Sequence, residues 1–424
     1  MNYRSFLLIF IIIQTMTLSA FSREDTIRLG RSYGLQMAGF ARIDYIYDTR
    51  QTNEAVEGLF TFFPLAPQLD ANGKDINATP KANFASIASR LSWRFFAPDV
   101  FGAKSTAYIE FDFTGTSNTN GVRMRQAWVN FGWKKTNLLL GRTWHPFATG
   151  TVPNVIALNT GAPFWAFNRS DMLRFDYKPG NWLLQAFALY QSDYCSLGPD
   201  LSINPSGKNP VYLRDATLPE LAAHIAYKKS GFQLGAVGSV KTIKPRQFTI
   251  SQNTGDRYKT NEKLTTYAAQ AYAQYQVANF ILKAQVNYLQ NTTESLQIGG
   301  YAVSEINPAT GHEKYTPTQY MNYWVNMDYG KKWQVGMFLG YLNSMGTLDN
   351  VADVNRWFAR GNNIKYMYRI SPHIFYNVNN WQFATEFEYT AAAFGKIEND
   401  KKAKIVDAKE VANFRTNLLI CFYF

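Results

Sequence analysis

Cysteine and histidine are scarce in this sequence. Its 424 residues include two cysteines, Cys195 and Cys421, and four histidines. Two cysteines cannot build a disulfide framework, and no ligand spacing typical of a metal site occurs. The G-x-S-x-G and H-E-x-x-H motifs of common hydrolases are also missing. We therefore expect no cofactor, no metal and no enzymatic activity, with a barrel lipase or protease as the competing interpretation.

Long apolar runs are absent after the N-terminus. Residues 1–22 combine Arg4, an apolar stretch and the small residues Ala20 and Ser22, a pattern typical of a cleaved secretory signal peptide. The apolar stretch is shorter than the ~20 residues that a spanning helix needs. An exported chain with neither such a helix nor disulfides must be stabilised by backbone pairing and burial.

Linkers, repeats and blocks of charge are missing as well, which favours one architecture over several domains. Lysine and arginine number 43 against 31 aspartates and glutamates. The basic residues occur in short runs rather than in an extended arm, so nucleic acid is not an expected partner. Distributed positive charge in an exported protein favours anionic small molecules or an acidic membrane surface as partners.

From Gly34 onward the dominant period of the sequence is two. Ile109 and Phe111, for example, alternate with Glu110 and Asp112. Such alternation is typical of strands with one apolar and one polar face. Its recurrence along the whole chain favours a sheet that separates lipid from water.

Short turns, such as residues 178–181, alternate with long polar loops, such as residues 192–217. This is the layout of an outer-membrane barrel whose turns face the periplasm. We predict an all-β fold, a 16-stranded antiparallel transmembrane β-barrel formed by residues 34–424. A short periplasmic segment, residues 23–33, precedes it, and the predicted location is the cell outer membrane.

Aromatic residues mark one end of the predicted strands. Five tryptophans lie within a few residues of a short turn: Trp93, Trp133, Trp182, Trp333 and Trp381. Indole rings favour the boundary between membrane and water, so this pattern predicts an aromatic girdle in contact with outer-membrane lipid. The chain ends on Phe424 after alternating apolar residues, which resembles the signal that barrel-assembly machinery reads. The last strand should close against the first.

The polar faces of the predicted strands carry more basic than acidic residues. The period assigns these residues to the pore lining and constriction: Arg90, Arg94, Glu110, Asp112, Arg123, Arg125, Arg142 and Arg174. The inward phase slips near residues 125–127, which predicts a bulge. Opposite charges could simply pair and order the wall. Alternatively, the excess of arginine focuses a positive field inside a narrow channel.

The connection formed by residues 145–169 is low in charge and rich in apolar and small residues, unlike the other long loops. Such a loop is poorly suited to bulk water. We predict that it folds into the barrel and forms the constriction, with His145 as a polar group at its mouth. Contact between subunits is the alternative role.

Several stretches resemble the DcaP-like porin family: "SRLSWRF", "AYIEFDFTG", "VRMRQAWVNFG", "LLLGRTWHPF", "TGAPFWAFNR" and "MLRFDY". The resemblance covers about residues 84 to 177. Members of this family are trimeric sixteen-stranded outer-membrane channels. The resemblance implies a homotrimer that passes small anionic solutes such as dicarboxylates. It also implies an inward loop at residues 145–169, with five arginines near the narrow region: Arg90, Arg123, Arg125, Arg142 and Arg174.

Other functions stay open at this level. A phosphate-selective porin is a related alternative. An adhesin would bind its partner through the long loops, and the sequence of these loops does not test that function. A receptor-gated transporter would need a plug domain before a larger barrel, for which the sequence provides no residues.

Overall fold

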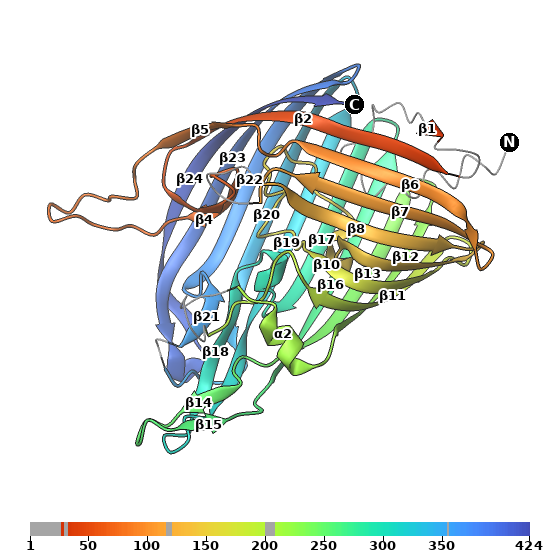
Figure 1. The fold of residues 1–424 in the computed structure, drawn as a ribbon. Helices are drawn as coiled ribbons and strands as arrows, with labels where there is room; N and C mark the ends of the chain where they lie inside the picture. The colour runs from red at the N-terminus through yellow and green to blue at the C-terminus, as the bar shows by residue number, and fades with distance from the viewer. Residues whose placement is uncertain (1–26, 29–32, 116–120, 200–207, 354–355) are drawn as a thin grey trace.

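The structure, a computed structural model, describes residues 27–28, 33–115, 121–199, 208–353 and 356–424. The predicted signal peptide, residues 1–22, and nearly all of the predicted periplasmic segment, residues 23–33, lie outside these ranges. Figure 1 shows tilted antiparallel strands arranged around a barrel. Among the described residues, no helix has the length and apolar character needed to cross a membrane.

Sixteen strands form the closed ring of the barrel, which confirms the predicted fold class. Each ring strand pairs antiparallel with its neighbours, and β24 closes the ring against β2, from the pair Phe40–Tyr423 to the pair Asp48–Arg415. The ring strands are β2 (Gly34–Asp48), β6 (Arg90–Val100), β7 (Ala103–Asp112), β8 (Arg123–Gly132), β9 (Thr136–Trp144), β10 (Arg169–Tyr177), β11 (Trp182–Gln191), β12 (Glu220–Lys229), β13 (Phe232–Ile243), β16 (Leu264–Val277), β17 (Phe280–Gln290), β19 (Glu313–Gly330), β20 (Trp333–Thr347), β22 (Ile364–Val378), β23 (Trp381–Glu398) and β24 (Lys404–Tyr423).

Shorter elements lie in the connections between ring strands. They are β1 (Ile27–Arg28), β3 (Thr52–Ala55), β4 (Phe60–Pro64), β5 (Lys81–Ala85), β14 (Phe248–Ile250), β15 (Arg257–Lys259), β18 (Gly299–Ile306), β21 (Trp357–Arg360), the helix α2 (Val211–Ala216) and the 3-10 turns η1 (Pro146–Ala148), η2 (Thr293–Ser295) and η3 (Asn399–Lys401). Both β5 and β6 pair with β2, and residues 86–89 between them belong to neither strand.

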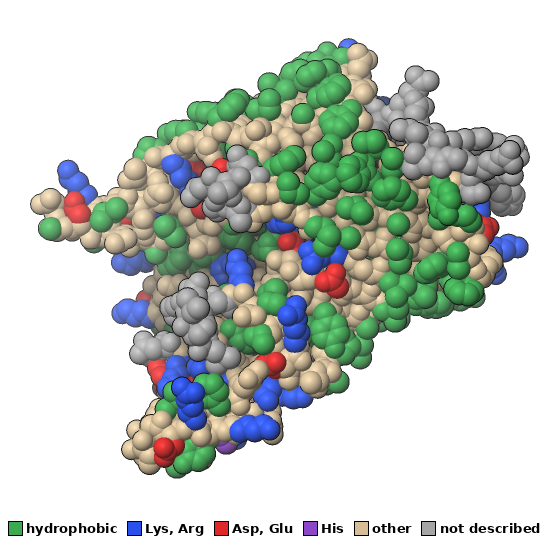
Figure 2. Space-filling view, viewed as in Figure 1, with side chains coloured by type: hydrophobic (Ala, Val, Ile, Leu, Met, Phe, Trp, Pro, Cys, Tyr) green, Lys and Arg blue, Asp and Glu red, His purple; other side chains and the backbone are tan. Residues whose placement is uncertain are grey.

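The two faces of the strands differ as the period of two predicts. On β24, Leu418 and Ile420 are 42% and 43% exposed, whereas Leu419 and Cys421 are 4% and 1% exposed. In Figure 2, hydrophobic side chains gather over the flank of the barrel, and charged side chains are more frequent near the end that carries β14 and β15. The outer face is therefore suited to lipid.

The tryptophans next to the short turns lie on this outer face. Trp133, Trp182, Trp333 and Trp381 are exposed, and Trp93 is partly exposed and packs edge-on against Phe111. Large amphipathic rings at one end of many hairpins form the arrangement expected of an aromatic girdle.

The predicted bulge lies on β8. Glu110 pairs with Gln126, and the next residue of β7, Phe111, pairs with Met124. Arg125 is thus the extra residue, and its side chain points inward together with that of Gln126, since both are buried. The bulge brings one more arginine to the lumen than regular alternation would.

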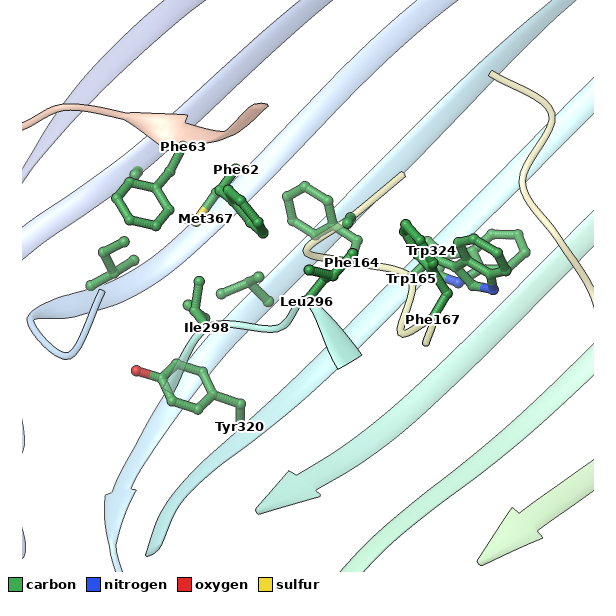
Figure 3. Packing of buried hydrophobic residues seen from close by; sticks show 14 of the residues in the cluster. Phe62, Phe63, Phe164, Trp165, Phe167, Leu296, Ile298, Tyr320, Trp324 and Met367 are labelled. Carbon is green, nitrogen blue, oxygen red and sulfur yellow. The ribbon is translucent and has the colours of Figure 1, made fainter. Parts of the chain in front are cut away.

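A hydrophobic core fills part of the lumen. Inward-facing residues of β19, β20 and β22, among them Trp324, Phe338 and Met367, pack against aromatic residues of β4 and of the loop after β9. Figure 3 shows Phe62, Phe63, Phe164, Trp165 and Phe167 converging with Leu296 and Ile298 on these strands. The open passage must therefore lie on the other side of the barrel, along β2 and β6 to β8.

Candidate functional site

The loop after β9 folds into the barrel, as its composition predicts. Its side chains are largely buried, and its backbone is hydrogen-bonded to the wall at several points. Asn154 donates to Asp328 of β19 at 2.9 Å, and Arg369 of β22 donates to the carbonyl of Ala162 at 2.9 Å. The loop is thus fixed across the lumen rather than free in solvent.

A second segment, residues 291–298, also turns inward, and the sequence did not predict this. The side chain of Gln297 donates to the carbonyl of Trp165, and the backbone N–H of Phe167 donates to the carbonyl of Ser295. Lys241 of β13 forms a buried ion pair with Glu294 at 2.5 Å. These contacts hold the end of the inward loop in place.

Between the loop and the opposite wall lies a cavity of about 260 Å³. Its wall is built from β2, β6, β7, β8 and β24, and its other side is the loop segment 152–158. The charged side chains that line it are four arginines and one glutamate: Arg42, Arg90, Arg94, Arg125 and Glu110. The passage is therefore basic on one side, whereas the facing loop segment is uncharged.

The acidic residues near this cavity are already neutralised by arginine. Arg125 donates to Glu110 at 2.8 Å and to Asp112 at 2.7 Å, and Arg123 contacts Asp112 at 3.0 Å. Both carboxylates are almost fully buried. Short, charge-assisted hydrogen bonds of this kind hold the carboxylates in their ionised form and order the wall.

Arg90 and Arg94 are much less engaged. The contact of Arg90 with Glu110 is long, at 3.8 Å, and its guanidinium lies 5.1 Å from the centre of the Phe40 ring. Within the described ranges, Arg94 forms no ion pair; its guanidinium lies 5.6 Å from the centre of the Tyr108 ring. The Nε atoms of both residues are buried without a hydrogen-bond partner. The guanidinium groups of these two residues are therefore not held by a close ion pair in the wall.

Arg142 does not line the lumen, which corrects its predicted position. It pairs across the sheet with Ala127 and Asp171, and its Nε lies 3.5 Å from the carboxylate of Asp171. Asp171 alternates with inward-facing Met172, and its side chain is 52% exposed. Alternation along β9 is regular, with Leu139 and Thr143 buried and Leu140 exposed, so it puts Arg142 on the outer face. The prediction instead groups Arg142 with the inward arginines of β8.

His145 departs from its predicted role, and Arg174 faces the lumen as predicted but lies outside the cavity. His145 is 2% exposed; its Nδ1 accepts the backbone N–H of Phe147, and its Nε2 contacts Glu220 at 3.2 Å. It anchors the start of the inward loop rather than lining the pore. Arg174 pairs with Asp176 at 3.0 Å on β10, outside the cavity.

Three contributors to the cavity were not among the predicted site residues. Arg42 follows the inward parity of β2, donates to Asp44 and reaches the carbonyl of Ile156 in the loop at 2.7 Å. Trp144 and Trp165 add aromatic surface. Parity alone identifies Arg42 as inward, but its contact with a loop residue more than a hundred positions away has no signal in the local sequence.

The described part of the chain contains no cluster of histidine, cysteine, aspartate and glutamate suited to a metal ion. The inward histidines are instead held by the wall. His373 contacts Asp328 at 2.9 Å, and His224 contacts Gln185 and Tyr272.

A ring of sixteen antiparallel strands with a loop folded into it is the architecture of a porin-type channel. Comparison with protein families finds no matching family model, and no curated protein matches the chain. Among solved structures, the outer-membrane channel DcaP of Acinetobacter baumannii is similar, with a TM-score of 0.66 and 18% identity over 94% of this chain and 99% of that one.

Two further structures share the fold at lower similarity. The anion-selective porin from Comamonas acidovorans has a TM-score of 0.54 and 9% identity over 92% of this chain and 100% of its own. OmpT of Vibrio cholerae, an outer-membrane protein, has a TM-score of 0.54 and 9% identity over 94% of this chain and 100% of its own. The resemblance to the DcaP-like porins is thus confirmed at the level of the fold.

Proposed function

We propose that the protein is an outer-membrane porin, a passive diffusion channel for small hydrophilic solutes with a preference for anions such as dicarboxylates. One observation carries this proposal: four arginines and a single glutamate are the charged residues that line the cavity beside the inward loop. A confined passage with low-dielectric walls focuses such a field and raises the local concentration of anions.

The net charge of the wider wall is also positive. Around the inward ends of β6, β7, β8 and β10 the charged side chains are Arg90, Arg94, Arg123, Arg125 and Arg169 against Glu110, Asp112 and Asp193, a net charge of +2 (5 − 3). Arginine also binds carboxylate through two parallel hydrogen bonds, which suits a dicarboxylate better than chloride. The fold shared with a porin described as anion-selective supports this preference.

Two acidic residues of β23 do not oppose this preference. Glu386 accepts two backbone N–H groups of the inward loop, and Glu388 pairs with Arg369 at 3.3 Å. Glu386 thus faces the loop backbone, and the charge of Glu388 is balanced by Arg369. Neither residue lines the cavity.

The proposal includes the expected surroundings of a porin. The exposed apolar flank contacts outer-membrane lipid, and Phe424 is presented to the barrel-assembly machinery. A homotrimer is the proposed assembly, since a trimer form is known for the similar OmpT of Vibrio cholerae. Cross-linking in native membranes, followed by mass measurement, tests the number of subunits.

The decisive experiment is the zero-current potential of the purified protein in a planar bilayer under a KCl gradient, repeated with succinate and with phosphate as the anion. A stable conductance with a potential of the sign for anion preference is expected. Preference for succinate over phosphate would support dicarboxylates, and the reverse order would favour a phosphate-selective porin. Cation preference would refute the proposed selectivity, and an absence of conductance would refute the channel itself.

A further inference from the structure

The arginines of the passage occupy two levels of the wall. On β6, Arg90 is the cross-strand partner of Asp112, which in turn is the partner of Arg123. Arg94 is four residues further along the same face, about 13 Å closer to the short-turn end of the strand. Its cross-strand partners are Gln36 and Tyr108, both uncharged.

The upper level is compensated only in part: its three arginines, Arg90, Arg123 and Arg125, share two carboxylates, which leaves one positive charge. The lower level has no described carboxylate. Asp112 and Glu110 satisfy Arg123 and Arg125 through contacts of 3.0 Å or less. At the lower level, no described carboxylate lies within ion-pairing distance of Arg94. Close ion pairs largely cancel at a distance, so the net positive charge of this part of the wall is shared between Arg90 and Arg94.

The surroundings of Arg94 hold its guanidinium ready to bind. It lies against the face of Tyr108, and Tyr108 is stacked on Trp128 with ring centres 5.2 Å apart and an angle of 23° between the ring planes. The hydroxyl of Tyr108 donates to Glu110, which fixes the ring. A guanidinium supported on one face by an aromatic ring keeps its edges free for a planar oxyanion.

We propose that Arg94 is a separate anion-binding position in the half of the passage nearer the short turns. There it selects carboxylate and phosphate oxyanions by paired hydrogen bonds. This inference rests on the proposed channel function. At the upper level, Arg123 and Arg125 act mainly as an ordered, neutralised wall. The anion preference then depends on Arg90 and Arg94, and Arg94 is the one with no described carboxylate beside it.

The test compares three variants of the full chain in planar bilayers. Arg94→Gln removes the charge, Arg94→Lys keeps the charge but removes the two-pronged geometry, and Arg174→Gln removes a lumen arginine that is paired with Asp176 outside the cavity. Two quantities are measured for each: the zero-current potential in a KCl gradient, and the fall in KCl current when succinate or inorganic phosphate is added.

Arg94→Gln is expected to lower the anion preference about fourfold, the effect of one unit charge acting about 5 Å away through water. It should also abolish the block by succinate and phosphate. Arg94→Lys should keep the KCl selectivity and weaken the block, because an ammonium group binds an oxyanion as a point charge. Arg174→Gln should match the wild type in both measurements. A block by succinate alone would assign the position to carboxylates, and a block by phosphate alone would assign it to phosphate.

Two outcomes would overturn the assignment. One is an Arg94→Gln channel with unchanged selectivity and block; the other is an equal loss in Arg174→Gln, which would show that only total charge matters. Both are distinct from a failure of the channel proposal, in which the wild type itself shows no anion preference. Because Arg94 forms no ion pair with a described carboxylate, its substitution leaves no buried charge unpaired. Folding of each variant is verified on gels, where the unheated, folded barrel should migrate as the wild type does.

Discussion

The carboxylate of Glu386 on β23 accepts the backbone N–H of Ile156, in the middle of the inward loop, at 2.6 Å, and that of Ala157 at 2.8 Å. From the neighbouring part of the wall, Arg42 donates to the carbonyl of Ile156 at 2.7 Å. An anion and a cation thus hold the two polar groups of a single loop residue. The width of the passage depends on this pair of contacts, because the loop is one of its two sides.

Glu386→Gln is expected to loosen the loop. A neutral amide accepts hydrogen bonds less strongly than a carboxylate, and bonds to charged groups contribute about 1.5–3 kcal/mol each. Single-channel recordings should show larger and noisier currents than the wild type. Asp176→Asn is the matched control, since Asp176 contacts Arg174 and Gln185 away from the loop. Equal current noise in wild type and Glu386→Gln would contradict this anchoring role.

Arg125→Gln is expected to destabilise the barrel as well as change its selectivity. Arg125 bonds to Glu110 and Asp112, which are both buried, and removing one partner of a buried charged group costs about 3–5 kcal/mol. The temperature at which the barrel loses its folded gel mobility should fall. The double variant Glu110→Gln, Arg125→Gln removes one ion pair, leaves Asp112 paired with Arg123, and should recover part of the loss. A stable single variant would show that water solvates the carboxylates.

The strand pattern of this protein could be predicted because each residue's face is fixed locally. Leu418 and Leu419 differ in exposure by a factor of about ten, as alternation requires, and the slip at Arg125 was visible as a break in that alternation. Arg142 was misplaced although its own strand alternates regularly. Leu139 and Thr143 are buried and Leu140 is exposed, so the local pattern puts Arg142 on the outer face.

The interior of the barrel was harder to predict than its wall. The composition of the loop after β9 indicated that it turns inward, but not that Glu386 holds it, since those residues are some 230 positions apart. The segment at residues 291–298 carries Glu294, which made it look like an ordinary polar loop. Its charge is neutralised by Lys241, a contact that exists only after the barrel closes.

Cys195 is expected to be nearly inert to alkylation in the folded protein. Burial in the loop after β11, followed by the nearby Glu294 and Asp193 carboxylates, raises the pKa of the Cys195 thiol to about 11. At pH 8 the reactive thiolate is about 100-fold rarer than for a thiol of ordinary pKa, so the labelling rate should be low at pH 8 and rise towards pH 11. Iodoacetamide labelling of a Cys421→Ala variant measures this rate at a single thiol. Rapid labelling at pH 8 without denaturant would show that the loop opens.

Gly39→Ala is expected to weaken the seam where the barrel closes. Gly39 on β2 exchanges two backbone hydrogen bonds with Phe424, and a Cβ there would lie 2.6 Å from the carbonyl oxygen of Arg90 and 2.9 Å from the Phe424 ring. Overpacking of this kind costs about 1–3 kcal/mol. The heat stability of folded gel mobility should therefore fall for Gly39→Ala, but not for the control Gly238→Ala, where a Cβ meets nothing within 4 Å.

A second substitution separates the two clashes at the seam. Phe424→Ala in the Gly39→Ala background removes the ring but leaves the carbonyl of Arg90, which belongs to the backbone of β6 and cannot rotate away. Heat stability should therefore recover only in part. Full recovery would show that the ring alone requires glycine, and equal stability of Gly39→Ala and Gly238→Ala would show that the seam can widen to admit a methyl group.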